Sequence, residues 1–290
     1  MTDSITIKAP AKINLVLDVT GRRPDGYHDL RMIMQTVALY DELTIKWIPE
    51  DEIVINSSVP IAGLKSPAQN LIYKAADLLR EYADIDGGFI IDLQKNIPAA
   101  AGMAGGSTDC AATLIGINKL LDLGLSDAVL RDLGVTLGAD VPYCIMKGTA
   151  LAEGIGEILT PLPAPPDFHV LLVKPDINVS TGFVYGNLSI DTLPSHPPVD
   201  DMVAAIKAKD KERIPKLLEN VLETVTIPEF PVIAELKNEL KALGADGVLM
   251  SGSGPTVFAL FKDFDACHAA LERCKQSYPQ YFSMQTGFSC

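Results

Sequence analysis

The sequence predicts an α+β protein of two domains, and three observations lead to that prediction. The chain has 290 residues, a length that suits one large domain or two ordinary ones. Its apolar residues follow strand spacing in some segments and helix spacing in others, so both kinds of element run through the chain. Four prolines crowd into LTPLPAPPD at 159–167, which is typical of a linker. We therefore expect an N-terminal domain at 1–157 and a C-terminal domain at 158–290.

The first half is predicted to hold strands followed by helices. Strand-like segments flank Pro10, and we expect a break there because proline cannot donate to a central ladder. Strands are predicted at 5–8, 11–19, 32–39, 43–47, 53–55 and 89–93. Helices are predicted at 70–82, 107–121 and 126–137. Asn70 suits the N-cap of the first helix.

In the second half, strands separated by helices, with one direct strand pair, predict a split βαβ sandwich of the ferredoxin type. The strands are expected at 169–173, 247–250, 256–261 and 281–286. The helices are expected at 180–187, 198–208, 211–223, 231–243 and 264–277. Gly244 is placed to end the fourth of these helices, because glycine adopts the left-handed conformation found there.

Composition and charge exclude several classes of protein. The 37 acidic and 24 basic side chains leave a net charge of −13, so we expect no nucleic-acid partner. No apolar run approaches the roughly 18 residues that span a bilayer, and we expect no membrane association. The first residues resemble neither a signal nor a transit peptide, and the five cysteines form no CxxC pair. We expect a reduced, cytoplasmic protein without a metal site built from its own side chains.

The most informative stretch is IPAAAGMAGGSTDCAATLIGINKL at 97–120. A strand leads into a loop of small residues, and a helix is expected to begin at Ser107. Glycines let backbone N–H groups approach a ligand, and a helix N-terminus adds free donors, so the loop is a candidate phosphate cradle. It lacks the lysine of GxxxxGK[ST], although Lys95 lies just before it and could reach a nucleotide. A tight strand–helix turn is the alternative.

Three further motifs carry chemistry only in combination with this loop. SGSGPTVFALF at 251–261 is either a hairpin turn or a second loop for an oxyanion. In PAKINL, Pro10 interrupts the strand, so the ammonium of Lys12 is expected to point out of the sheet. In LGADVPYC, Asp140 is expected at the end of an apolar helix, where the helix dipole disfavours an acid. Asp140 then either has a functional partner or is simply part of a turn before Pro142.

The three blocks in order, PAK, PxxxGxxGGSTDxA and GSGP, resemble the GHMP superfamily of small-molecule kinases, which includes galactokinase, homoserine kinase, mevalonate kinase and phosphomevalonate kinase. The resemblance covers the whole chain. It implies an N-terminal domain like ribosomal protein S5, a C-terminal ferredoxin-like domain, and ATP and Mg²⁺ as the phosphoryl donor and its metal ion.

GRRPDGYHDL at 21–30, LGADVPYC at 137–144 and AEGIGE at 152–157 are similar to one branch of that superfamily. The branch uses ATP to phosphorylate the 2-hydroxyl of 4-diphosphocytidyl-2-C-methyl-D-erythritol in non-mevalonate isoprenoid synthesis, giving the 2-phosphate and ADP. The resemblance thus implies a cytidine diphosphate-linked polyol as substrate, bound by a monomer or a homodimer. The alternatives are a kinase of the mevalonate or homoserine type, which would not need Tyr27 and His28, and a sensor, which should have lost Lys12 or Asp140.

The matched positions imply a role for each site residue. Asp140 would act as the base and Lys12 as the charge stabiliser. The nucleotide site would comprise Asn70, Lys95, Pro98, Ala99, Ala100, Ala101, Gly102, Met103, Ala104, Gly105, Gly106, Ser107 and Thr108. The substrate site would comprise Asn14, Tyr27, His28, Asp140, Thr181 and Tyr185.

The loop departs from the family pattern at two positions of the glycine-rich segment. Met103 and Ala104 stand where leucine and glycine are common in the family. A left-handed backbone at Ala104 would cost roughly 1–2 kcal/mol and would weaken ATP binding. Cys110 is expected to be a packed residue of the helix and not a reactive thiol. Mg²⁺ is expected near Ser107, held largely through water.

Overall fold

A computed structural model describes residues 3–60, 66–193 and 195–289. These residues form two compact units, each assembled from separate stretches of the chain. Unit 1 comprises residues 1–11, 39–99 and 104–146, and unit 2 comprises residues 12–38, 100–103 and 147–290. The boundaries of these units differ from the single domain boundary expected between residues 157 and 158. That domain boundary stays a prediction. Within the described part of the chain, no helix is long and apolar enough to cross a bilayer.

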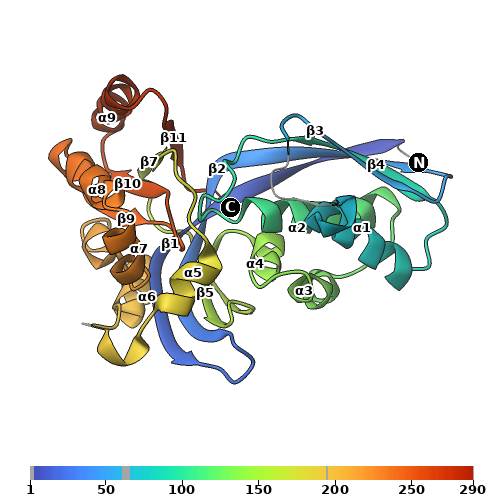
Figure 1. The fold of residues 1–290 in the computed structure, drawn as a ribbon, viewed down its shortest axis with the longest axis horizontal. Coiled ribbons are helices and arrows are strands. Elements are labelled where there is room, and N and C mark those ends of the chain that lie inside the picture. Colours follow the sequence, from blue (N-terminus) through green and yellow to red (C-terminus); the bar gives the residue numbers. More distant parts are fainter. Residues whose placement is uncertain (1–2, 61–65, 194, 290) are drawn as a thin grey trace. The chain divides into compact units, whose positions relative to one another are not determined.

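Unit 1 packs helices against strands (Figure 1). Its strands are β3 (Ile53–Ser57), β4 (Gly88–Gln94), and parts of β1 (Ser4–Arg22) and β2 (His28–Ile48). Its helices are α1 (Leu71–Tyr82), α2 (Gly105–Leu120), α3 (Asp127–Val135) and α4 (Val141–Met146). β4 pairs parallel with β3 and antiparallel with β2, while α2 packs against α1 and α4. The fully buried rings of Phe89 and Tyr143 mark the core of this unit.

Unit 2 carries a four-stranded antiparallel sheet in the order β11-β7-β10-β9. These strands are β7 (His169–Lys174), β9 (Gly247–Met250), β10 (Val257–Phe261) and β11 (Phe282–Gly287). α8 (Val232–Ala242) and α9 (Phe264–Ser277) pack on the sheet. In chain order this is a βαββαβ arrangement with strand order 4-1-3-2, so the predicted ferredoxin-like sandwich is confirmed.

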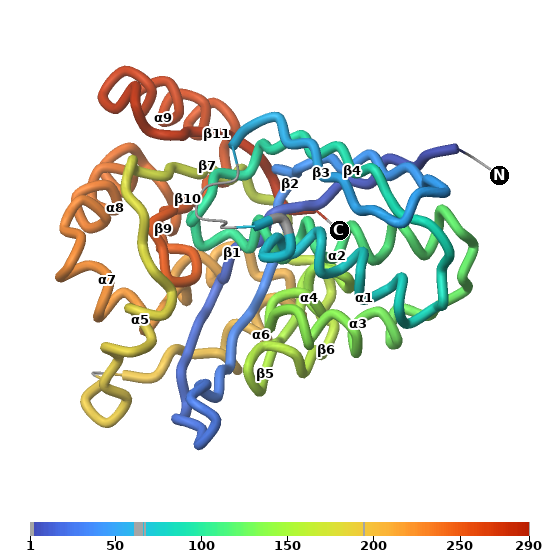
Figure 2. The backbone as a smooth tube through the Cα atoms, turned by 45° about the vertical axis from the view of Figure 1, so that its right-hand side comes forward, coloured from blue at the N-terminus to red at the C-terminus, as the bar shows by residue number. Residues whose placement is uncertain are grey.

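The rest of unit 2 comprises the remaining parts of β1 and β2 together with short strands and helices. These short elements are β5 (Thr149–Gly154), β6 (Ile158–Leu162), β8 (Glu219–Asn220), α5 (Thr181–Asn187), α6 (Val199–Lys207) and α7 (Glu223–Glu229). β5 pairs antiparallel with β2 and β6, and β8 pairs parallel with β1. Figure 2 traces the hairpin of β1 and β2, whose turn at 23–27 is closed by the Arg23 N–H donating to the Tyr27 carbonyl at 2.9 Å.

Most predicted elements are present at nearly the predicted bounds, but the break at Pro10 is wrong, because β1 is continuous from Ser4 to Arg22. N–H groups two residues apart on a strand point to the same edge, and the Lys12 N–H donates to the Met103 carbonyl at 3.2 Å. Pro10 therefore has its missing N–H on the same edge of β1 as the Lys12 N–H, which binds a loop carbonyl and not a neighbouring strand.

Two predictions in the second half are also wrong. The helix expected at 211–223 is instead a 3₁₀ helix at Ile214–Leu217 followed by β8. Helical spacing of apolar residues misled there, because Pro215 and the pairing of β8 with β1 favour a different backbone. The linker expected at 159–167 begins as the strand β6, where Pro161 is accommodated because the strand lies at a sheet edge.

Candidate active site

The loop between β4 and α2 holds three residues in the left-handed conformation. Their φ angles are +48° at Ala100, +70° at Gly102 and +57° at Ala104, which is the N-cap of α2. The helix begins at Gly105, two residues earlier than predicted, and its first intrahelical bond runs from the Thr108 N–H to the Ala104 carbonyl at 2.9 Å. The preceding N–H groups of the first turn have no partner within the helix, as a phosphate cradle requires. The left-handed Ala104 is strained by roughly 1–2 kcal/mol.

Gly102 lies tightly against the Ser251–Gly254 turn, within unit 2. A Cβ atom at position 102 would overlap the Ser251 carbonyl oxygen and would lie 3.0 Å from that of Gly254. The Ser251 hydroxyl donates to the Gly102 carbonyl at 3.0 Å. The two Gly-rich motifs are therefore in direct contact, and the first needs glycine both for its φ angle and for the space.

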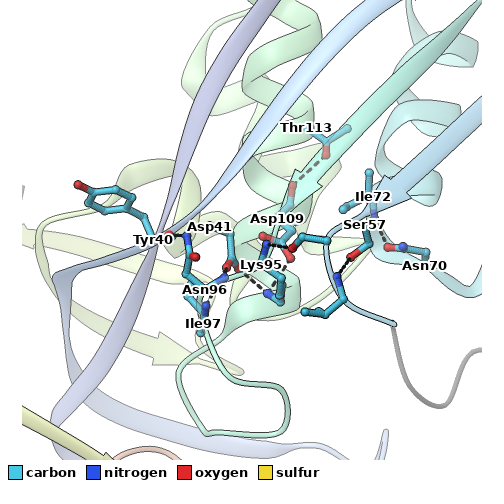
Figure 3. A network of polar contacts seen from close by, with 12 residues as sticks. Tyr40, Asp41, Ser57, Asn70, Ile72, Lys95, Asn96, Ile97, Asp109 and Thr113 are labelled. Carbon is cyan, nitrogen blue, oxygen red and sulfur yellow. Dashed lines mark hydrogen bonds and ion pairs between the residues drawn. The ribbon is translucent and has the colours of Figure 1, made fainter. Parts of the chain in front are cut away.

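Lys95 lies between two buried carboxylates (Figure 3). Its ammonium pairs with Asp41, and it donates to Asp109 Oδ2 at 2.9 Å. The other oxygen of Asp41 accepts the N–H groups of Asn96 at 2.6 Å and Ile97 at 2.8 Å. A Cβ at Gly105 would lie 3.0 Å from the Lys95 ammonium, so this cluster sits at the first residue of α2.

Burial raises the pKa of Asp109 to about 8, with the charge of Asp41 raising it further and Lys95 lowering it. Asp109 is only 3% exposed, and its Oδ1 has no hydrogen-bond partner among the described residues. Burial thus favours the neutral form of Asp109 at pH values below about 8. Cys110, next along the helix, is buried and its pKa is raised to about 12, which confirms that it is a packed residue and not a reactive thiol.

Lys12 and Asn14 lie on one face of β1 within unit 2. The Lys12 ammonium donates to Asn14 Oδ1 at 2.8 Å, and the amide of Asn14 contacts the Met32 sulfur at 3.2 Å. Lys12 is 5% exposed, and Asn14 is fully buried. Asn14 therefore fixes the position of the Lys12 ammonium, in agreement with the side-chain alternation expected for a strand.

Asp140 precedes a helix instead of ending one, and the expected position was wrong. α3 ends at Val135, and the Cys144 N–H donates to the Asp140 carbonyl at 3.0 Å as α4 begins. An acid before the first turn of a helix is favoured by the dipole, so the placement is no electrostatic anomaly. Asn70 is confirmed as the N-cap of α1, because its side-chain oxygen accepts the Ile72 N–H at 2.9 Å.

An aromatic pair forms where the GRRPDGYH motif meets α5, within unit 2. The rings of His28 and Tyr185 have centroids 5.3 Å apart and are tilted by 36°. Burial lowers the pKa of His28, and the charge of Arg22 lowers it further, so the imidazole is neutral at pH 7. Tyr27 is 57% exposed, and the hydroxyls of Thr181 and Ser253 are hydrogen-bonded at 2.9 Å.

The sequence is similar to proteins of a known family along most of its length. Models of the N-terminal and C-terminal domains of the GHMP kinases match residues 70–148 and 202–280. The 4-diphosphocytidyl-2-C-methyl-D-erythritol kinase of Lachnoclostridium phytofermentans is 52% identical over 273 residues, covering 94% of this chain and 93% of that protein. The chain belongs to the 4-diphosphocytidyl-2-C-methyl-D-erythritol kinase family of GHMP kinases. It is thus an ATP-dependent small-molecule kinase.

Solved structures agree with this membership and with the predicted two-domain α+β GHMP fold. A crystal structure of 4-(cytidine 5'-diphospho)-2C-methyl-D-erythritol kinase matches with a TM-score of 0.81 and 32% identity, covering 99% of this chain and all of that one. A homoserine kinase from Cytophaga hutchinsonii matches with a TM-score of 0.80 and 21% identity, covering 100% of this chain and 95% of that one, so it shares the fold.

Two buried acids of this GHMP kinase, Asp41 and Asp109, were not anticipated from its motifs. One signal for Asp41 was present, because Leu39, Asp41 and Leu43 occupy alternate, inward positions of β2, and an acid at such a position must have a partner. Asp109 lies inside the matched motif, but nothing in the sequence distinguishes a neutral buried acid from an exposed one.

Proposed function

We propose that this chain phosphorylates the 2-hydroxyl of 4-diphosphocytidyl-2-C-methyl-D-erythritol with ATP, in the synthesis of isoprenoid precursors. The observation that carries the proposal is the contact between the ring of His28, in the GRRPDGYH motif, and the ring of Tyr185 on α5. A small aliphatic alcohol would not need such an aromatic pair for its binding. A neutral imidazole and a phenol suit stacking on the cytosine base, which is worth roughly 0.5–1.5 kcal/mol beyond the buried area. Tyr27, Thr181 and Asn14 complete the proposed substrate site.

In the proposed reaction, the substrate oxygen attacks the γ-phosphorus of ATP, the bond to the β-phosphate oxygen breaks, and ADP leaves. Asp140 orients the hydroxyl and accepts its proton as the new bond forms, an effect worth typically about 10²–10⁴-fold in rate. Lys12, held by Asn14, offsets the charge that develops on the transferring phosphoryl group. Positioning and charge stabilisation account for most of the catalysis of phosphoryl transfer.

The nucleotide is proposed to bind at Pro98–Thr108, with Lys95 and Asn70 nearby. The left-handed residues of this loop and the open first turn of α2 support that assignment, because both turn backbone N–H groups toward an anion.

The residues at the start of α2 fit the Mg²⁺ that accompanies ATP. Within the described ranges no three His, Cys, Asp or Glu side chains are grouped to hold a metal ion, so phosphate oxygens and water would supply most ligands. Ser107 is the candidate protein ligand. Its hydroxyl lies 4.0 Å from the position that a Cβ atom of residue 138 would occupy, and Gly138 is close along the chain to Asp140, the proposed base. When bound, the ion neutralises charge on the ATP oxygens.

The test is ADP release with Mg-ATP and the diphosphocytidyl substrate, with mevalonate and homoserine as control substrates. Asp140→Asn should lose roughly 10²-fold or more in kcat. Asp122→Asn, an exposed acid in the connection after α2, is the matched control and should retain full activity. Turnover of a control substrate alone would refute the substrate assignment, and an active Asp140→Asn variant would refute the assigned base.

A further inference from the structure

The turn between β9 and β10 is held by a buried asparagine that belongs to none of the motifs named in the sequence analysis. Asn220, on β8, donates through its side-chain amide to the carbonyls of Met250 at 2.9 Å and Gly252 at 2.8 Å. Its side-chain oxygen accepts the Leu222 N–H at 3.0 Å. Asn220 is 4% exposed and lies opposite Leu17 of β1 in the parallel pair. Two of the three hydrogen bonds of this side chain therefore fix the backbone of the turn, and the third holds the Asn220 side chain to its own segment of the chain.

This turn, in turn, fixes the backbone of the loop that precedes α2. The Ser251 hydroxyl, fully buried, binds the Gly102 carbonyl, while the Lys12 N–H of β1 binds the Met103 carbonyl at 3.2 Å. Two consecutive carbonyls of the loop are thus engaged by the protein. The chain of contacts runs from Asn220 through the turn to Gly102, and every member belongs to unit 2.

The orientation of these carbonyls determines where the neighbouring N–H groups point. In a trans peptide the C=O and the following N–H point in opposite directions. With the Gly102 carbonyl turned to Ser251, the Met103 N–H points away from that side chain, and the Ala104 N–H likewise points away from β1. A reversal of the Gly102–Met103 peptide would be easy for a glycine and would put a carbonyl oxygen where the cradle needs a donor.

We propose that Asn220 and Ser251 are positioning residues of the ATP site, which hold the Gly102–Met103 peptide with its N–H toward the triphosphate. The inference rests on the proposed assignment of Pro98–Thr108 as the ATP loop. It adds two residues that act through the backbone and need not touch the nucleotide.

The experiment compares the wild type with Ser251→Ala and Asn220→Asp. Asn220→Asp keeps the shape of the side chain but replaces the donating amide by an acceptor. Asn118→Asp is the matched control, because Asn118, in the last turn of α2, likewise holds a backbone segment by accepting the Leu125 N–H at 3.0 Å and donating to the Leu125 carbonyl at 2.9 Å. Affinity for the Mg²⁺ complex of a non-hydrolysable ATP analogue is measured by calorimetry, and the KM values for ATP and for the diphosphocytidyl substrate by steady-state kinetics.

Both test variants should weaken binding of the ATP analogue roughly threefold to tenfold and raise the KM for ATP by a similar factor, the range expected for one net hydrogen bond. The KM for the second substrate should change less than twofold, and Asn118→Asp should leave both KM values alone. Unchanged analogue binding in both variants, or equal weakening in the control, overturns the inference. The absence of analogue binding by the wild type overturns it together with the loop assignment. Because binding is measured without the second substrate, a wild type that binds the analogue but does not phosphorylate that substrate contradicts only the proposed function.

Discussion

Replacing Asp109 by asparagine should make the protein progressively more stable than the wild type as the pH rises from 5 to 9. In the folded protein, burial holds the pKa of Asp109 at about 8, against an ordinary value of 3.8. At pH values between these two pKa values, the carboxyl group of Asp109 has lost its proton in the unfolded chain and keeps it in the folded chain. The folded state then binds more protons, so the free energy of unfolding of the wild type falls as the pH rises. The asparagine side chain of the variant would not titrate, and Lys95 could still donate to its oxygen.

The size of the effect follows from the interval over which the two states differ. From pH 5 to the folded pKa near 8 there are about three pH units, each worth 1.36 kcal/mol, which sets an upper bound of about 4 kcal/mol. Relaxation and water entry reduce the penalty of a buried charge, so we expect about 2 kcal/mol to be observed. The sign is the decisive part, because an ionised Asp109 paired with Lys95 would make the substitution destabilising throughout.

The assay is urea unfolding at half-unit pH intervals, with the wild-type values subtracted from those of Asp109→Asn so that other titrating groups cancel. Asp41→Asn serves as the contrasting variant. Asp41 accepts two backbone N–H groups and pairs with Lys95, so its loss should cost about 3 kcal/mol or more at pH 7. A flat difference across the pH range, or equal destabilisation by the two variants, would refute the neutral state of Asp109.

Four further substitutions test the loop and the aromatic pair. Gly102→Ala should lower stability by about 2 kcal/mol or more and weaken ATP binding, measured by urea unfolding and calorimetry, because its φ is +70° and its Cβ would overlap the Ser251 carbonyl. Ala104→Gly should raise stability by up to about 1 kcal/mol and lower the KM for ATP, since relief of the left-handed strain exceeds the entropy that glycine adds to the unfolded chain. His28→Ala and Tyr185→Ala should each raise the KM for the diphosphocytidyl substrate by roughly threefold to tenfold without changing that for ATP, in steady-state assays. The opposite sign for Ala104→Gly, or an ATP-specific defect in either ring variant, would contradict these assignments.

Sequence patterns predicted the elements whose ends are marked by nearby residues. They failed where the backbone conformation depends on a partner strand that is distant in the sequence. The helix capped by Asn70 and the helix ended by Gly244 were predicted correctly because their end signals lie in the sequence itself. The strand β8 could not be predicted, because only two residues take part and their conformation depends on β1. Pro10 shows the same limit, since a proline breaks a ladder only where the missing N–H has a strand to bind, and a sequence does not say which edge that is.

The site shows the same division between local and distant information. From the sequence, Ala104 is expected to be strained if its backbone is left-handed, and its φ angle of +57° shows that it is. In contrast, the predicted position of Asp140 was wrong because a short helix, α4, begins directly after it, and six residues carry too little periodicity to predict a helix. The sequence signals only that Asp41 is buried, through its inward position on β2. The contacts that Asp41 and Asp109 make with Lys95 were out of reach, because Lys95 lies more than a dozen residues from each along the chain.

These observations together explain how a chain with a net charge of −13 accommodates a triphosphate. The lysine that follows the glycines in a Walker A motif is absent, and Lys95 is already paired with Asp41. Lys95 is engaged by both Asp41 and Asp109, and burial favours the neutral form of Asp109. In the proposed ATP site, the phosphates would then be bound mainly by backbone N–H groups and Mg²⁺. For such a site the orientation of single peptides matters more than the number of nearby cations, which is why the contacts of Gly102 and Ser251 should affect ATP affinity more than any substitution of an exposed lysine.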